Sequence, residues 1–180
     1  MKGFRLNATR VWGFLIVILS MILLVGCSEN PMGVAPDQSE PQLLQRSTLA
    51  VEAIQRSTVP LYTERVVSSA EGGVMSLFDV VLEIPAGAVP NDTLFSIAIP
   101  DINVFYNEFG TNGLVFDVPV KVTMSYRDAD LTGIDESTIR IGWLNGTTGL
   151  FQDVVCTIDR VNKTVSGEVM HFSAYALISD

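Results

Sequence analysis

Short runs in which apolar and polar residues alternate constrain the fold of this chain more than any other feature. In the clearest run, Val120, Val122, Met124 and Tyr126 alternate with polar neighbours, which gives an extended strand one apolar and one polar face. Further runs follow from about residue 61 at a spacing typical of a β-sandwich or barrel. The expected strands are 74–84, 93–99, 114–126, 138–144, 150–158, 164–169 and 173–178.

Turn-forming residues stand between these runs and mark the expected connections. The turn segments are Pro85-Ala86-Gly87, Pro90-Asn91-Asp92, Asn112-Gly113, Asn145-Gly146 and Asn162-Lys163. A segment of about 115 residues is long enough to bury one hydrophobic core. We therefore predict an all-β fold, one antiparallel β-sandwich that spans residues 61–180.

The beginning of the chain has a different pattern. Lys2, Arg5 and Arg10 precede residues 11–26, which carry no charge, and a basic region followed by an apolar region is typical of an export signal. An uncleaved membrane anchor is the alternative, but the apolar run is shorter than the roughly 20 residues that cross a bilayer as a helix. We predict that residues 1–26 are a signal peptide.

Cys27 follows this leader directly after Leu24-Val25-Gly26. The segment resembles the lipobox of bacterial lipoproteins, in which the cysteine thiol receives a diacylglyceryl group and the chain is cut before the cysteine. The resemblance implies several acyl chains on Cys27, which would hold the mature protein at a membrane because each buried methylene contributes about 0.8 kcal/mol. Ser28 stands where lipoproteins retained at the inner membrane carry Asp, so we expect a lipid-anchored protein of the cell envelope, at the outer membrane.

The mature chain would be strongly acidic. Removal of residues 1–26 takes away Lys2, Arg5 and Arg10 from the 11 Lys and Arg residues and none of the 20 Asp and Glu residues, so the net charge becomes about −12. Nucleic acid and anionic lipid are bound through clustered positive charge, so neither is an expected partner of this surface. The expected partner is another protein or a component of the cell envelope.

Residues 27–60 are expected to connect the lipidated cysteine to the domain. The stretch from Ser28 to Gln42 is rich in Pro, Ser, Glu, Gln and Asp and poor in aromatic residues, which is the composition of a flexible tether. Residues 42–58 contain apolar residues that fit a helical pattern only loosely. Either a short helix or more linker is therefore expected there.

Two segments of the predicted domain resemble ZU5 domains. The first contains Gly72-Gly73, an apolar strand and the corner Ile84-Pro85-Ala86-Gly87-Ala88, and the second ends in His171-Phe172-Ser173-Ala174-Tyr175-Ala176-Leu177. Proline fixes φ and glycine permits angles that other residues resist, which suits a corner where a strand leaves its sheet. ZU5 domains mostly serve as protein-interaction or autoinhibitory modules, so the resemblance implies binding rather than catalysis.

His171-Phe172-Ser173 is the one group of residues that would suit a reaction. In some ZU5-containing proteins a similar tripeptide cleaves itself, which implies that Ser173 would attack the Phe172 carbonyl with His171 as base or orienting group. That reaction needs a strained peptide bond and a nearby base. Only residues 173–180 follow the bond, so no downstream domain would be released. The alternative is an uncut segment that begins a strand.

Asp128, Asp130, Asp135 and Glu136 crowd one predicted loop. Four carboxylates would suit a hard cation such as Ca²⁺, but their spacing lacks the order of an EF-hand, which favours a solvated acidic turn. His171 is the only histidine, which excludes a His-rich zinc site. We predict no metal and no cofactor, and we expect that the protein is not an enzyme.

Several apolar residues have a structural and a functional interpretation. Cys156 lies in an alternating run and is expected to pack as a small hydrophobe. Trp143, Phe151, Phe116 and Tyr126 would form a sugar-binding platform if they were exposed, but alternating strand positions favour the core.

Residues 101–113 lie between two expected strands and carry Phe105, Tyr106 and Phe109. We expect this stretch to be irregular, as either an aromatic contact loop or a packed flap. With the leader and the acidic surface, these features predict a membrane-tethered, non-enzymatic β-sandwich module.

Overall fold

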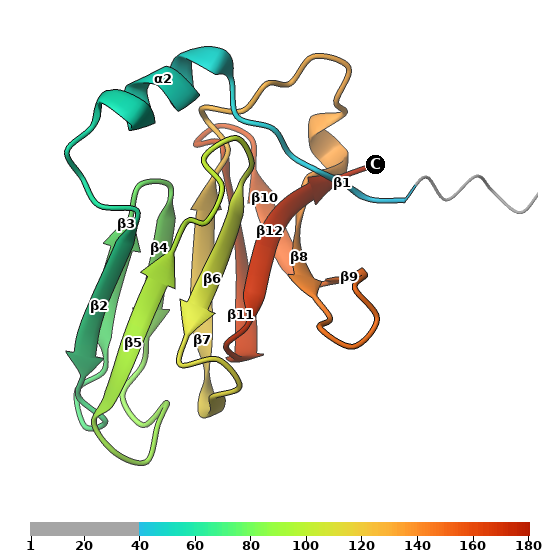
Figure 1. The fold of residues 1–180 in the computed structure, drawn as a ribbon. Coiled ribbons are helices and arrows are strands. Elements are labelled where there is room, and N and C mark those ends of the chain that lie inside the picture. The colour runs from blue at the N-terminus through green and yellow to red at the C-terminus, as the bar shows by residue number, and fades with distance from the viewer. Residues whose placement is uncertain (1–39) are drawn as a thin grey trace, which may run out of the picture. The chain divides into compact units, whose positions relative to one another are not determined.

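Two antiparallel sheets lie face to face in the computed structural model, which describes residues 40–180 (Figure 1). The predicted signal peptide, Cys27 and most of the predicted tether lie outside the described residues. The prediction of an all-β sandwich is confirmed. Within residues 40–180, no helix is long and apolar enough to span a membrane.

The larger sheet contains seven strands of the described chain. Its spatial order is β2-β5-β6-β12-β8-β9, and β1 pairs with the end of β12. The strands are β1 (Gln42–Leu43), β2 (Tyr62–Val67), β5 (Thr93–Ala98), β6 (Tyr106–Gly110), β8 (Arg140–Leu144), β9 (Phe151–Asp153) and β12 (Ala174–Ser179).

The smaller sheet contains five strands of residues 40–180, in the order β10-β11-β7-β4-β3. They are β3 (Gly73–Leu77), β4 (Val80–Ile84), β7 (Val115–Ser125), β10 (Cys156–Asp159) and β11 (Thr164–His171). β7 lies at the centre and shows the predicted alternation, because Val120, Val122 and Met124 are fully buried whereas Lys121 is exposed.

Aromatic side chains fill the space between the sheets. Phe172 is fully buried, and its ring meets Phe95 and Phe116 edge-on at centroid distances of 5.1 and 4.8 Å. The Phe109 ring is tilted by 55° against the Phe172 ring, with 5.6 Å between the ring centroids. Each such side chain stabilises the fold by about 1.5–3 kcal/mol through its removal from water. The segment that contains Phe172 is therefore part of the core.

Two predicted strands are each divided in the structure. The stretch 74–84 is a hairpin of β3 and β4, because Phe78 and Asp79 form a two-residue turn between paired Leu77 and Val80. Phe78 has φ 50°, a left-handed conformation that bulky residues rarely adopt. The turn therefore lacks the Gly or Asn that would have predicted it from the sequence. The stretch 150–158 contains β9 and β10, which belong to different sheets.

The expectation of an irregular stretch at 101–113 is wrong for its central part. Residues 106–110 form β6, which pairs with β5 and β12. Phe105 and Phe109 are buried in the core and Tyr106 is half-buried, so a packed segment replaces the hypothesis of an aromatic contact loop. Every second residue of this segment is buried, namely Phe105, Asn107 and Phe109, which is the pattern of a strand with one face in the core. The sequence pattern does not show this clearly, because the middle one of these residues is the polar Asn107.

The domain begins earlier than residue 61. β1 pairs Gln42 with Ser179 and Leu43 with Ile178, and Leu44 is buried in the core. The boundary at 60/61 is therefore too late, because residues 42–46 join the sheet through pairing with a strand far along the sequence. The expected short helix is present as α2 (Thr48–Arg56), where Ser47 accepts a hydrogen bond from the backbone N–H of Ala50 as its N-cap.

Candidate functional site

The segment 42–57, which we call the strap, crosses one end of the sandwich. Figure 1 shows α2 above the end at which the β3–β4 hairpin turns. The Leu44 N–H donates to Leu177 O at 2.9 Å, and the Phe105 N–H donates to Leu44 O at 3.1 Å. On the other side the Ser47 N–H donates to Asp128 O, and the Asp130 N–H donates to Gln45 O. The strap therefore bonds both to the larger sheet and to the loop that leaves β7.

The Arg46 side chain attaches the strap to the β3–β4 turn. Its Nη2 lies 2.9 Å from Asp79 Oδ1 and donates a hydrogen bond to Oδ2 at 3.2 Å. The two side chains are only 2% and 7% exposed. The Arg46 guanidinium also lies 4.1 Å from the centre of the Phe105 ring, a cation–π contact. One arginine thus joins the strap, the β3–β4 turn and the start of β6.

Burial dominates the electrostatics of this pair. Desolvation raises the pKa of Asp79 above its usual value, even though the positive charge of Arg46 opposes the shift. Nearby Asp128 raises the pKa of Asp79 further. Within the described chain, the Arg46 Nε atom is buried and has no hydrogen-bond partner. For a buried pair of this kind, the cost of desolvation offsets much of the attraction between the two charges.

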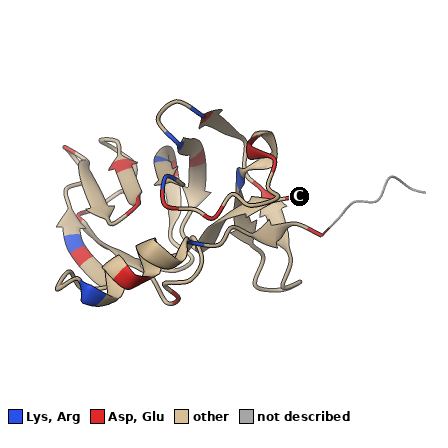
Figure 2. Cartoon of the chain, turned by 90° about the horizontal axis from the view of Figure 1, so that it is seen from above, with Lys and Arg blue, Asp and Glu red and all other residues tan. Residues whose placement is uncertain are grey.

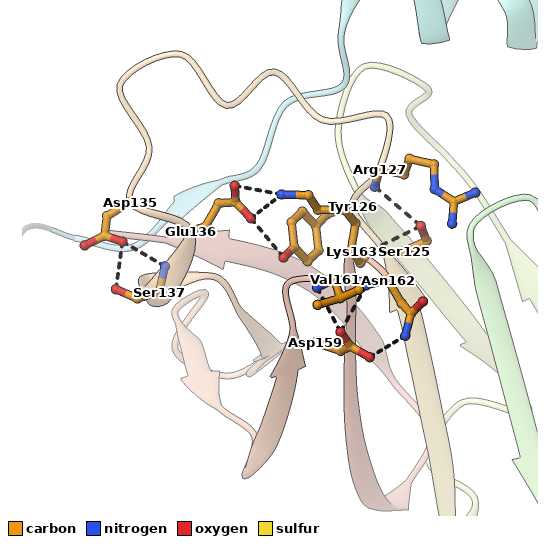
Figure 3. Close-up of polar contacts among 10 residues, drawn as sticks. All are labelled: Ser125, Tyr126, Arg127, Asp135, Glu136, Ser137, Asp159, Val161, Asn162 and Lys163. Atoms are coloured by element: carbon orange, nitrogen blue, oxygen red, sulfur yellow. Dashed lines mark hydrogen bonds and ion pairs between the residues drawn. The ribbon is translucent and has the colours of Figure 1, made fainter.

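A second charged cluster lies at the same end, between β7, η1 (Glu136–Thr138) and the β10–β11 turn (Figure 3). Lys163 Nζ donates to both Glu136 carboxylate oxygens at 2.8 and 2.7 Å, and Tyr126 Oη donates to Glu136 Oε2 at 3.1 Å. Lys163 lowers the pKa of Glu136, whereas burial and the bond to Glu136 raise the pKa of Tyr126 to about 12.

The carboxylates of the predicted acidic loop do not meet at one point. Asp130 accepts from the Thr132 N–H, and Asp135 accepts from the Ser137 N–H and hydroxyl as the N-cap of η1. Glu136 faces Lys163. No three Asp, Glu, His or Cys residues within 40–180 are grouped to hold a metal ion. Figure 2 shows acidic and basic positions dispersed over this end.

His171-Phe172-Ser173 lies at the opposite end, where β11 passes into β12. The Phe172 N–H donates to Leu114 O at 2.9 Å, and the Gly113 N–H donates to Phe172 O at 3.0 Å. Both backbone groups of Phe172 are therefore held by the segment that precedes β7. The Ser173 hydroxyl has no hydrogen bond to His171 or to any other residue of the described chain.

The His171 ring is turned toward other aromatic residues. Tyr175 Oη donates to His171 O at 2.8 Å and lies 3.4 Å from His171 Nδ1. The Trp143 ring meets the His171 ring at 4.8 Å, and burial raises the pKa of Tyr175. The geometry supports a role for His171 in packing the end of β11 and gives Ser173 no base.

The remaining candidate residues divide between core and surface. Phe116 and Tyr126 are buried, whereas Trp143 and Phe151 are half-buried. These four residues do not form one exposed platform. Cys156 is half-buried against the core, in agreement with its expected packing as a small hydrophobe.

Sequence reasoning missed Arg46 and Asp79, the most deeply buried charged pair of the described chain. One signal was available, since Asp79 interrupts the apolar run of the expected strand 74–84. Nothing local in the sequence pointed to Arg46, which lies 33 positions away.

Comparison of the sequence with models of known protein families finds no match, and comparison with curated proteins finds no similar sequence.

Proposed function

We propose that this protein is a membrane-tethered, non-enzymatic β-sandwich module that binds a protein or another component of the cell envelope. The tether is the lipidated Cys27 that follows the signal sequence, and the location is the outer membrane. The resemblance of the corner at Pro85 and of the ending at His171 to ZU5 domains supports a binding role.

One observation carries the non-enzymatic part of this proposal. The side chains that would suit chemistry lie at opposite ends of the sandwich, and most of them are engaged in the fold. Glu136 pairs with Lys163, Asp135 caps η1, and His171 packs against Trp143 and Tyr175. A hydrolase needs a nucleophile and a base within hydrogen-bond reach of each other, and Ser173 and His171 lack that contact.

Lipid attachment is tested by labelling cells with radioactive palmitate and separating their membranes. We expect label on the wild-type polypeptide and its recovery in the membrane fraction, and we expect both to be lost in Cys27→Ser. An unlabelled chain that retains Met1 would contradict the tether.

Intact mass of the mature protein tests the absence of self-cleavage. Wild type and Ser173→Ala should both retain residues 173–180 and differ only by the mass of one oxygen atom. Loss of this segment from wild type alone would replace the proposal with an autoproteolytic domain.

Binding is tested by photo-crosslinking in native membranes with a probe at Val66 or Val155, which are 60% and 95% exposed. We expect a saturable adduct that unlabelled mature protein suppresses. The absence of any saturable adduct with probes on each face of the domain would oppose a binding role.

A further inference from the structure

The strap is attached differently from the rest of the domain. Leu44 is the only residue of 42–57 that belongs to the buried core, and α2 contains no buried residue. Leu49 on α2 is 77% exposed. The attachment therefore depends on one apolar residue, on backbone hydrogen bonds, and on Arg46, which pairs with Asp79 and lies over the Phe105 ring. Segments with few buried apolar contacts are the ones that open before the global unfolding of a protein.

A charged fastening opens more readily than an apolar fastening of the same size. Arg46 and Asp79 lose their hydration when the strap docks, and they regain it when the strap leaves. An apolar side chain in the place of Arg46 would instead expose its surface to water on release. The choice of residues at this contact thus favours docking that is specific but reversible.

Release of the strap would leave the sandwich largely closed. Phe172 packs against Phe95 and Phe116 between the sheets, and of residues 42–57 only Leu44 belongs to the same core cluster. The pairings β7–β11 and β4–β7, which hold the smaller sheet together, also exclude the strap.

We propose that the strap is a reversible fastening whose release lengthens the connection between Cys27 and the sandwich. Residues 28–39 span at most about 40 Å, whereas residues 28–60 span at most about 110 Å when fully extended. The release itself rests on the geometry of residues 42–57. The gain in reach rests on the proposed lipid tether.

Native-state hydrogen exchange on the full mature protein tests this inference. The reporters are the amides of Leu44, Arg46 and Ser47, which donate to Leu177, Asn103 and Asp128. We expect them to exchange together, at least about tenfold faster than the protected amides of β7, and with little dependence on low denaturant. Exchange of these amides only together with β7 would overturn the proposal.

Paired variants test the role of the charges. In Arg46→Met/Asp79→Leu the exchange of the three strap amides should slow by at least about tenfold, because release now exposes apolar surface. Lys121→Met/Glu83→Leu is the matched control, since this ion pair joins β7 to β4 and both side chains are about half exposed. The control should leave strap exchange unchanged. Equal effects of the two double variants, or faster strap exchange in the first, would refute the role of the charges.

A covalent lock gives a second measurement. Gln42 and Ser179 are directly paired, so Gln42→Cys/Ser179→Cys in a Cys156→Ala background should close a disulfide across β1 and β12. Oxidation should slow exchange at Leu44 to the rate of β12, and reduction should restore it. A result that is independent of oxidation would contradict strap release. Failure of palmitate labelling would instead remove the tether and leave the strap results standing.

Discussion

Two ion pairs at the same end of this sandwich have nearly the same length and opposite energetics. Arg46 and Asp79 are 2.9 Å apart and almost fully buried, whereas Lys163 and Glu136 are 2.7 Å apart with side chains 35% and 28% exposed. Burial raises the pKa of Asp79, and the lysine lowers the pKa of Glu136. At nearly equal separation of the charges, desolvation is the larger influence on the pKa of Asp79, whereas the hydrogen bond from Lys163 is the larger influence on the pKa of Glu136.

The two ion pairs also attach their segments in different ways. Glu136 and Lys163 hold two loops at the surface and keep part of their hydration, so loss of one partner leaves the other in contact with water. Arg46 and Asp79 are sealed below the strap, so loss of one partner leaves a buried charge alone. The sealed pair should be sensitive to single substitutions and tolerant of a matched double substitution.

The largest effect is expected for Arg46→Ala. Removal of the guanidinium leaves the Asp79 carboxylate buried and unpaired, and the free energy of unfolding should fall by about 3–5 kcal/mol. Urea unfolding, followed by the fluorescence of Trp143, measures this change.

The corresponding double variant, Arg46→Met/Asp79→Leu, should match wild type or exceed its stability by up to about 4 kcal/mol. A loss as large as that of Arg46→Ala would mean that the buried charges stabilise the fold on balance, and the comparison above would then be wrong.

A smaller effect is expected for Tyr126→Phe. The substitution keeps the buried ring and removes the hydroxyl that donates to Glu136, so unfolding should become easier by about 1 kcal/mol. The same urea experiment applies. A loss of unfolding free energy as large as that of Arg46→Ala would indicate that water is excluded from this cluster as fully as from the Arg46–Asp79 pair.

Lys163→Met should cost less than either change, because the Lys163–Glu136 pair is screened by solvent. The difference from wild type should shrink as sodium chloride is added, since exposed charges are screened within a Debye length. Arg46→Ala in the same salt series is the control. Its loss of unfolding free energy should not change with salt. A salt-independent loss in Lys163→Met would contradict partial exposure.

The smallest expected effect concerns pH. Stability should change with pH in opposite directions for the two pairs, because the pKa of Asp79 is raised and the pKa of Glu136 is lowered. The raised pKa of Asp79 makes wild type lose stability as pH rises through and above 3.8, whereas the lowered pKa of Glu136 makes wild type lose stability as pH falls below 4.5. The advantage of wild type over Glu136→Gln should therefore shrink in acid. Relative to Arg46→Met/Asp79→Leu, wild type should gain stability in acid. Urea midpoints at several pH values measure both trends, and equal signs would refute the assignment.

Much of the fold was predictable because alternation within a strand is a local property. The run at Val120 and the turns around Asn112-Gly113 and Asn145-Gly146 predicted strands that the structure contains. The hairpin at Phe78 was not predictable from turn composition, because a left-handed phenylalanine has no typical turn signal. Its conformation is maintained by contacts that form only after folding, such as the bond of the Ser125 N–H to Asp79 O.

The strap was predictable only as a short helix. Its attachment depends on pairing between Gln42 and Ser179, which are separated by most of the domain, and no pattern within residues 42–58 specifies that partner. Composition also placed the boundary too late, since Leu44 and Arg46 occur among polar residues of the kind found in linkers. The reactive interpretation of His171 depended on a tripeptide, whereas the orientation of its ring depends on Trp143 and Tyr175.

The pairing of Gln42 with Ser179 also determines how this domain tolerates additions. A fluorescent protein or epitope joined after Asp180 would begin beside Gln42, where the polypeptide enters the sandwich, so it would crowd the strap. An insertion at the Asn145-Gly146 turn, between β8 and β9, would avoid that crowding. Reporters intended to leave the strap free should be placed at this turn rather than at the carboxyl terminus.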